Sequence, residues 1–332
     1  MNGGEIDASY EGGKGGVGIL AFKDTEATIN DGTITCGSAC IMGNGSESGS
    51  NEGTNAKFTI NGGTITSTNA LCIYAPQVNG ETLITGGTIT GYTSAIEIRA
   101  GKLTITGGTI NGNESEYLIE PNSNGSNTIG AAISVVQHTT KQPIEVNITG
   151  GTFNANIPIS EANAMNNSPE DVAKITINIS DGLFNATGDK TLDLEDVNGD
   201  IITGGTYTHD VQEYFNEEQY GKKDNGDSYT ILPYRTIYVK EGTNESVVNT
   251  NKILPGDVVV VNEEGTNEFG TWLSFETLTL CHIDTSAILP ELLTAEEKDW
   301  LNTYNERVFR TLSPSLPKEI ASWLREKTKK II

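Results

Sequence analysis

The stretch Ile84-Thr-Gly-Gly-Thr-Ile-Thr90 decides the expected fold, because near copies of it recur through the first two thirds of the chain. A weak copy opens the chain at Asn2, and the others begin at Ile29, Ile60, Ile84, Ile105, Ile148, Ile179 and Ile202. Recurrence of one sequence motif along the chain indicates a repeat architecture. Most copies follow one another after 21 to 31 residues, but 43 residues separate Gly108 from Gly151. That interval is about twice the shortest one, so it predicts a repeat that has lost the motif.

Two neighbouring columns of residues fix the register of the repeats. The first column is apolar and reads Ile34, Ile65, Ile89, Ile110, Phe153, Phe184 and Tyr207. The second is polar and reads Thr35, Thr66, Thr90, Asn111, Asn154, Asn185 and Thr208. Adjacent residues of a strand face opposite sides of a sheet, so the first column is predicted to point inward and the second outward. Short β-branched runs between glycine corners, each stacked in parallel on its copy, predict a mainly β protein of the β-solenoid type.

Charge and composition limit the possible functions. The 332 residues include 21 Lys+Arg and 44 Asp+Glu, which gives a formal net charge of −23. Such a surface repels phosphate backbones, so no nucleic-acid partner is expected. No run approaches the roughly 20 consecutive apolar residues that a membrane-spanning helix needs, so no membrane span is expected.

A change in composition divides the chain into segments. Every glycine lies at or before Gly270, whereas all three tryptophans lie after it. This change predicts two segments of different origin. We expect a parallel β region at residues 1–210, a small β cap or connector at 211–262, and a separate segment at 263–332.

The Ile-Thr-Gly-Gly-Thr-(Ile/Phe) units resemble those of right-handed parallel β-helix surface proteins of gut Gram-positive bacteria, over about residues 2–230. The resemblance implies a non-catalytic, exported surface or adhesion module whose partner is a glycan or a host or cell-surface protein. The start, Met1-Asn-Gly-Gly-Glu-Ile6, has no basic or apolar region and no polar cap before the first repeat. We therefore expect the natural chain to begin further upstream, signal peptide included, and to be extracellular or on the cell surface.

An enzymatic alternative for the repeats is a polysaccharide lyase or hydrolase. Such chemistry needs paired carboxylates or acids beside a basic residue, but the outward column holds only Thr and Asn. The basic candidates are Arg99, His138 and His209, and Glu97 is predicted to pair with Arg99 on one outward face. The cysteines are Cys36, Cys40, Cys72 and Cys281. They show no C-x-x-C spacing, so no zinc site is expected, and Cys40 and Cys72 are predicted to be small core residues.

The C-terminal segment contains Phe275-Glu-Thr-Leu-Thr-Leu280, then Ile283-Asp284 and the run Trp300-Leu-Asn-Thr-Tyr304. It resembles the C-terminal end of Xaa-Pro aminopeptidases, the aminopeptidase P branch of the M24 pita-bread metallopeptidases. The resemblance implies that Glu276 corresponds to one of five ligands of a dinuclear metal centre. The family has proline where this chain has His282, which puts the local turn in doubt.

The contexts of the other four ligands, two aspartates, a histidine and a second glutamate, are not found upstream of Glu276. Glu276 is therefore expected to be a vestigial ligand in an inactive metallopeptidase remnant, with no cofactor bound. The alternative is a functional Xaa-Pro metalloaminopeptidase-related protein that needs Mn²⁺ and is cytoplasmic, as that family usually is.

Two helices are expected in this segment. Thr294 and Glu297 form a capping box for a helix buried along Leu301, Tyr304 and Val308. Pro317 is predicted at the first position of a second helix, with Ile320, Trp323 and Leu324 on one buried face.

Overall fold

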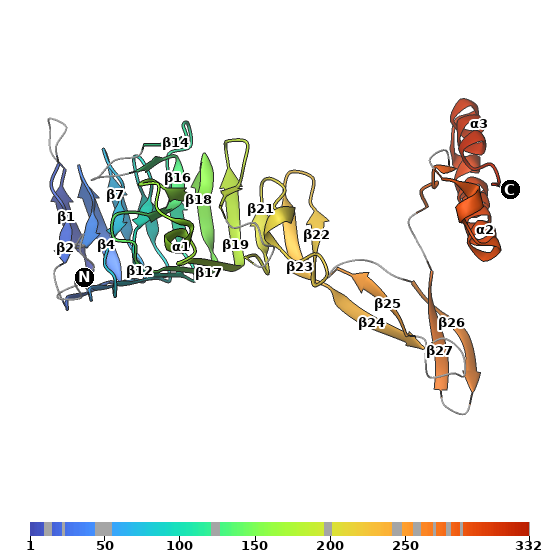
Figure 1. Cartoon of the computed structure of the whole chain (residues 1–332), viewed down its shortest axis with the longest axis horizontal. Helices are drawn as coiled ribbons and strands as arrows, with labels where there is room; N and C mark the ends of the chain where they lie inside the picture. Colours follow the sequence, from blue (N-terminus) through green and yellow to red (C-terminus); the bar gives the residue numbers. More distant parts are fainter. Residues whose placement is uncertain are drawn as a thin grey trace. The chain divides into compact units, whose positions relative to one another are not determined.

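A computed structural model describes residues 1–9, 15–21, 24–43, 55–120, 127–195, 201–240, 248–254, 260–267, 270–276, 280–285 and 288–331 (Figure 1). The chain forms two compact units, Met1–Arg235 and Thr236–Ile332. The protein is mainly β, with a short helical region near its C-terminus, as the sequence predicted. The expected divisions at residues 210 and 262 remain predictions.

The larger sheet of the first unit has 14 strands, of which twelve form two parallel rows and two form a hairpin at its end. The first row holds the motif strands β1 (Asn2–Ala8), β4 (Asp31–Cys36), β7 (Thr64–Ser67), β10 (Thr88–Thr90), β13 (Thr109–Asn111) and β21 (Gly205–Tyr207). The second row holds β3 (Glu26–Ile29), β6 (Lys57–Ile60), β9 (Glu81–Ile84) and β12 (Gly101–Ile105). Two long strands, β17 (Ile144–Ala155) and β19 (Ile175–Ala186), belong to both rows. Neighbours within each row are parallel and pair motif on motif, for example Ile65 with Ile89 and Ile89 with Ile110.

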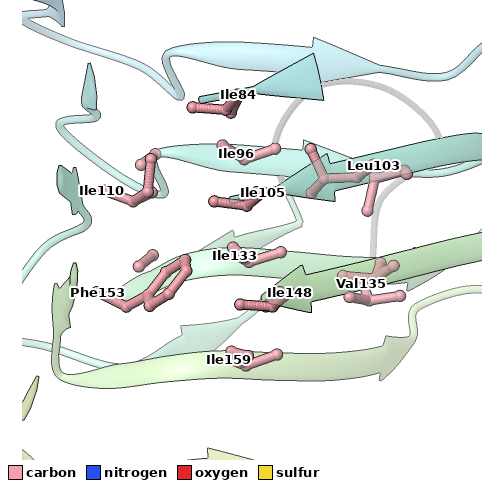
Figure 2. Packing of buried hydrophobic residues seen from close by; sticks show 14 of the residues in the cluster. Ile84, Ile96, Leu103, Ile105, Ile110, Ile133, Val135, Ile148, Phe153 and Ile159 are labelled. Atoms are coloured by element: carbon pink, nitrogen blue, oxygen red, sulfur yellow. The ribbon is translucent and has the colours of Figure 1, made fainter. Parts of the chain in front are cut away.

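A second sheet of seven parallel strands faces the first across the core. Its members are β2 (Ile19–Ala21), β5 (Ile41–Gly43), β8 (Ile73–Ala75), β11 (Ile96–Ile98), β16 (Ala131–Gln137), β18 (Ile157–Asn163) and β20 (Leu192–Asp193). Figure 2 shows Ile96, Ile133 and Ile159 of this sheet stacked in line beside Ile105 and Ile148 of the larger sheet. The core is therefore a series of aliphatic ladders.

The predicted inward column is confirmed, because every one of its seven residues is fully buried. Three consecutive members carry rings, and these rings stack. The centroids of Phe153 and Phe184 are 4.7 Å apart, and those of Phe184 and Tyr207 are 4.8 Å apart. The outward column is half-buried throughout, as expected for residues on the opposite side of the same strands.

The glycine pair of the motif allows the repeats to stack closely. A Cβ atom on Gly86 would lie 2.5 Å from the carbonyl oxygen of Asn61 in the preceding repeat. Gly87 has φ of +88°, a backbone conformation that side chains other than glycine rarely adopt. Gly86 therefore allows the preceding repeat to approach closely, and Gly87 allows the positive φ at the turn.

The prediction of a repeat without the motif between Gly108 and Gly151 is wrong. Strand β13 pairs directly with β17, Ile110 opposite Phe153, so no strand of this row lies between them. The described part of the additional residues, 113–120 and 127–130, is called here the 113–130 excursion and contains the short antiparallel pair β14 (Leu118–Ile119) and β15 (Thr128–Ile129). Another excursion carries the one-turn helix α1 (Pro169–Val172).

The parallel pairing of the first unit ends in an antiparallel hairpin. After the 3₁₀ turn η1 (Gln212–Tyr214), strands β22 (Tyr220–Asp224) and β23 (Tyr229–Pro233) pair with each other. Strand β23 also pairs antiparallel with β21 and so covers that strand.

The second unit has two β pairs and a helical pair. The strands are β24 (Arg235–Lys240) with β25 (Val248–Ile253), and β26 (Val260–Asn267) with β27 (Gly270–Glu276). The helical part consists of η3 (Pro290–Leu292), α2 (Ala295–Leu312), η4 (Ser313–Ser315) and α3 (Lys318–Lys327). No helix among the described residues is both long enough and apolar enough to cross a membrane.

The helix predictions are partly right. The capping box of Thr294 is present, and Leu301 and Val308 are buried, whereas Tyr304 is only half-buried. Pro317 is the N-cap of α3 rather than its first residue. The buried face predicted for α3 is wrong, because of its three members only Leu324 is buried while Ile320 and Trp323 are exposed. The buried side of α3 is completed by Thr328, one turn further on.

Candidate functional site

Glu276, the predicted vestigial metal ligand, is the last residue of β27 and lies opposite Val260 of β26. Its side chain is outside the described part of the structure. The segment that follows, residues 280–285, is bound to helix α2. Asn305 accepts a hydrogen bond from the Ile283 N–H (2.9 Å) and donates one to the Ile283 carbonyl (3.0 Å), while the Tyr304 hydroxyl donates to the Cys281 carbonyl (2.9 Å). The buried Asn305, which the sequence reasoning missed, therefore fixes the segment after Glu276.

Ion pairs join the two helices and the segment before them. Glu306 accepts from Arg325 of α3 (2.6 Å) and from Arg310 of its own helix (2.9 Å). The hydrogen bond from Arg325, and to a smaller extent that from Arg310, holds the pKa of the Glu306 carboxyl below its usual value. Asp284 pairs with Lys327 at 3.2 Å.

The peptidase resemblance implies a dinuclear metal centre that includes Glu276. Among the described side chains, which do not include that of Glu276, no three His, Cys, Asp or Glu come together as a metal site would require. The nearby Asp284 is paired with a lysine, and the His282 ring packs edge-on against Trp323 with centroids 5.1 Å apart. The described residues therefore do not fit a centre of two divalent cations.

Large apolar side chains are exposed on the helical pair. Trp300 is 62% exposed and stacks on Tyr304, while Trp323 is 49% exposed. Leu289 and Leu292, which precede α2, are exposed as well. A contiguous exposed apolar patch marks an interaction surface, whereas single exposed apolar side chains are ordinary.

In the first unit, the outward column forms a ladder of side-chain hydrogen bonds. Asn185 donates to Asn154 (2.8 Å), Asn154 to Asn111 (2.8 Å) and Asn111 to Thr90 (3.2 Å), each across two neighbouring strands. The ladder is half-buried, so its outer side faces solvent. Amide and hydroxyl groups in a regular row can donate to and accept from the hydroxyl groups of a sugar or the backbone of a peptide.

The predicted pairing of Glu97 with Arg99 is confirmed, at 2.6 Å. Both side chains are buried rather than solvated, because Asn127 of the 113–130 excursion covers them. Arg99 donates to the Asn127 side chain (2.7 Å), and the Asn127 N–H donates to Glu97 (2.8 Å). The ion pair therefore holds the excursion against the second sheet.

The basic residues considered for lyase chemistry have different neighbours. His138 contacts Thr139 and His209 contacts Thr191, while Arg99 is engaged with Glu97. These contacts do not bring the three residues together around one carboxylate pair.

Beside α1 lies a groove of about 600 Å³ that the sequence reasoning missed. Its lining includes Glu161 of β18 and the aliphatic residues Ile175 and Ile177 of β19. Glu161 is buried and accepts a hydrogen bond from the Glu195 N–H (3.2 Å). Glu161 pairs with the core residue Val135 and so occupies a column that is apolar elsewhere, which only the strand register of the structure shows.

Comparison with known proteins supports the resemblance of the C-terminal segment. The family described as the C-terminal region of peptidase_M24 matches residues 271–331. The "Probable Xaa-Pro aminopeptidase P" of Coprinopsis cinerea is 39% identical over 77 residues, 22% of this chain and 12% of that protein. The "Xaa-Pro aminopeptidase ApepP" of Drosophila melanogaster is 40% identical over 63 residues, 18% of this chain and 10% of that protein. No solved structure matches. The chain thus spans only a small part of these relatives, and the resemblance of the first unit to surface proteins stays a prediction.

Proposed function

We propose that this chain is an Xaa-Pro aminopeptidase-related protein in which the M24 C-terminal segment is a non-catalytic element joined to a right-handed parallel β-helix. The observation that carries the proposal is the match over residues 271–331, which covers only the C-terminal region of the peptidase family and contains Glu276 as the one residue assigned to the metal centre. A single carboxylate does not hold two divalent cations. In this proposal, Glu276 is vestigial and the described ion pairs keep the helical segment folded.

The test is release of the N-terminal residue from an Xaa-Pro peptide by the full chain in the presence of Mn²⁺. We expect no release above background, and no difference between the wild type and Glu276→Gln. Glu291→Gln, which changes an exposed acid in the same unit, is the matched control. Mn²⁺-dependent release that is lost in Glu276→Gln but kept in Glu291→Gln would show instead that the chain is a working metalloaminopeptidase.

A second candidate function concerns the first unit, and the ladder of Asn and Thr side chains favours it. We propose that the β-helix is a surface or adhesion module that binds a glycan or a host or cell-surface protein through this ladder. The ladder repeats at about the 4.8 Å spacing of neighbouring strands, so it offers a periodic partner the same hydrogen bond several times.

Glycan-array binding by the full chain tests this second proposal. The triple variant Asn111→Ala, Asn154→Ala and Asn185→Ala should lose binding, whereas Leu83→Ala, an exposed residue of β9 outside the ladder, should keep it. Binding that is unchanged in the triple variant would refute the ladder as the contact surface. The module proposal also implies an exported protein, whereas the peptidase relationship implies a cytoplasmic one, and fractionation of the native source separates them.

A further inference from the structure

Three cysteines of the first unit lie together in the core near its N-terminal end. Cys36 is the last residue of β4. Cys40 and Cys72 come directly before β5 and β8, respectively. All three are fully buried, and all three are free thiols. The prediction that Cys40 and Cys72 are core residues is therefore confirmed, but their mutual arrangement has a chemical consequence.

Cys40 and Cys72 occupy the same position on neighbouring parallel strands. The next residues, Ile41 and Ile73, are paired in register, and the Cys40 N–H donates to the Cys72 carbonyl at 2.8 Å. Neighbouring strands lie about 4.8 Å apart, which is inside the Cα separation of about 4.4–6.8 Å that a disulfide requires. Each thiol donates to a backbone carbonyl of the facing sheet, Cys40 to that of Ile34 (4.0 Å) and Cys72 to that of Ile65 (3.5 Å).

The surroundings of these thiols determine how fast they can react. Burial raises the pKa of the Cys36 thiol to about 12, and the Cys72 thiol together with burial raises the pKa of Cys40. Thiolate is the reactive form, so the closed core reacts slowly. Strand β2 pairs with β5 beside Cys40; an oxidant reaches the thiols before this pairing forms or when it opens locally.

We propose that Cys40 and Cys72 are an oxidation site at which a small-molecule disulfide of the glutathione class ties two successive repeats together. One protein thiolate attacks the small disulfide, forms a mixed disulfide and releases one small thiol. The second protein thiolate then attacks the protein sulfur of that mixed disulfide and releases the other small thiol. Two protein thiols lose two hydrogens and two electrons, and the small disulfide is reduced to two thiols. This inference is independent of the proposed peptidase relationship.

The experiment uses the full chain in a Cys281→Ala background, because Cys281 is exposed and could form disulfides between molecules. The protein is unfolded in urea and refolded in oxidised or reduced glutathione, so that burial does not block access. Free thiols are then alkylated under denaturing conditions, and intact mass and cross-linked peptides are measured. Cys36→Ala, Cys40→Ala and Cys72→Ala are compared, after far-UV circular dichroism has shown that each folds.

We expect the oxidised background protein and Cys36→Ala to lose two alkylatable thiols and to yield one peptide that links positions 40 and 72. Cys40→Ala and Cys72→Ala should keep their remaining thiols. The thermal midpoint of the first unit should rise by roughly 5–10 °C on oxidation, and only where both cysteines are present. Retention of all three thiols after refolding in oxidised glutathione, or a cross-link between Cys36 and Cys40 instead, would overturn the proposal. If either Cys40→Ala or Cys72→Ala fails to fold, the other of these two variants gives the same test, because each removes one partner of the proposed disulfide.

Discussion

Replacing Phe184 by alanine is expected to be among the most destabilising single changes in the first unit. The ring is fully buried and stacked on both sides, with Phe153 at 4.7 Å and Tyr207 at 4.8 Å between centroids. Loss of a core phenylalanine costs about 3–5 kcal/mol, and each stacked ring pair adds about 0.5–1.5 kcal/mol beyond its buried area. Because two ring pairs are lost at once, we expect a decrease of about 5 kcal/mol in the free energy of unfolding.

The chain provides separate signals for its two units. All three tryptophans lie after Gly270, so tryptophan fluorescence follows the second unit. Far-UV circular dichroism in the β region follows mainly the first unit, which holds most of the strands. In a urea titration, Phe184→Ala should move the dichroism transition to lower urea and leave the fluorescence transition unchanged. The matched control is Leu183→Ala, the preceding residue of the same strand, which is 40% exposed and should cost less than about 1 kcal/mol.

The position of Phe184 within the stack gives a second comparison. Phe153→Ala removes only one ring pair, because its other neighbour in the column is Ile110. We therefore expect Phe153→Ala to cost about 1 kcal/mol less than Phe184→Ala. Equal effects of Phe184→Ala and Leu183→Ala, or a shift of the fluorescence transition instead, would refute the assignment of this column to the core.

Three further predictions concern other parts of the chain. Arg99→Met leaves the Glu97 carboxylate buried without its ion-pair partner and should cost about 3–5 kcal/mol by urea unfolding, whereas the double variant with Glu97→Gln should recover part of that loss. Thr294→Ala removes the capping box and should cost the helical pair about 1 kcal/mol by tryptophan fluorescence, with Thr294→Ser retaining most of it. The pKa of Glu306 is lowered, chiefly by Arg325, so its stabilisation is present above the usual value of 4.5 and is lost as pH falls through the lowered pKa. An acid titration of tryptophan fluorescence should show this loss in the wild type, and Glu306→Gln should abolish that part of the change.

Features set by the local period could be predicted from the sequence. The inward column needs only the alternation of neighbouring residues and a repeated motif, and each member from Ile34 to Tyr207 is buried. The capping box needs only Thr294 and Glu297 three residues apart. In both cases the determining interactions lie within one strand or one helical turn.

Features that depend on pairing across the chain could not be predicted in the same way. An excursion and a repeat without a motif lengthen the interval by similar amounts, and only the register of Ile110 with Phe153 distinguishes them. The buried state of Arg99 depends on Asn127, which lies in that excursion. The exposure of Trp323 depends on how much surface α3 shares with α2, which the pattern of α3 alone does not contain.

The two units differ in whether their cores are sufficient for independent folding. The first has a continuous core that runs through both sheets, whereas the buried apolar residues described in the helical pair are Leu301, Val308 and Leu324. A core of this size is marginal for an isolated segment, and Trp300 and Trp323 remain exposed beside it. In the two relatives the matched region is only 12% and 10% of the protein, so most of their chain lies outside it. Because the first unit has the larger core, binding experiments on this chain should begin with that unit rather than with Glu276.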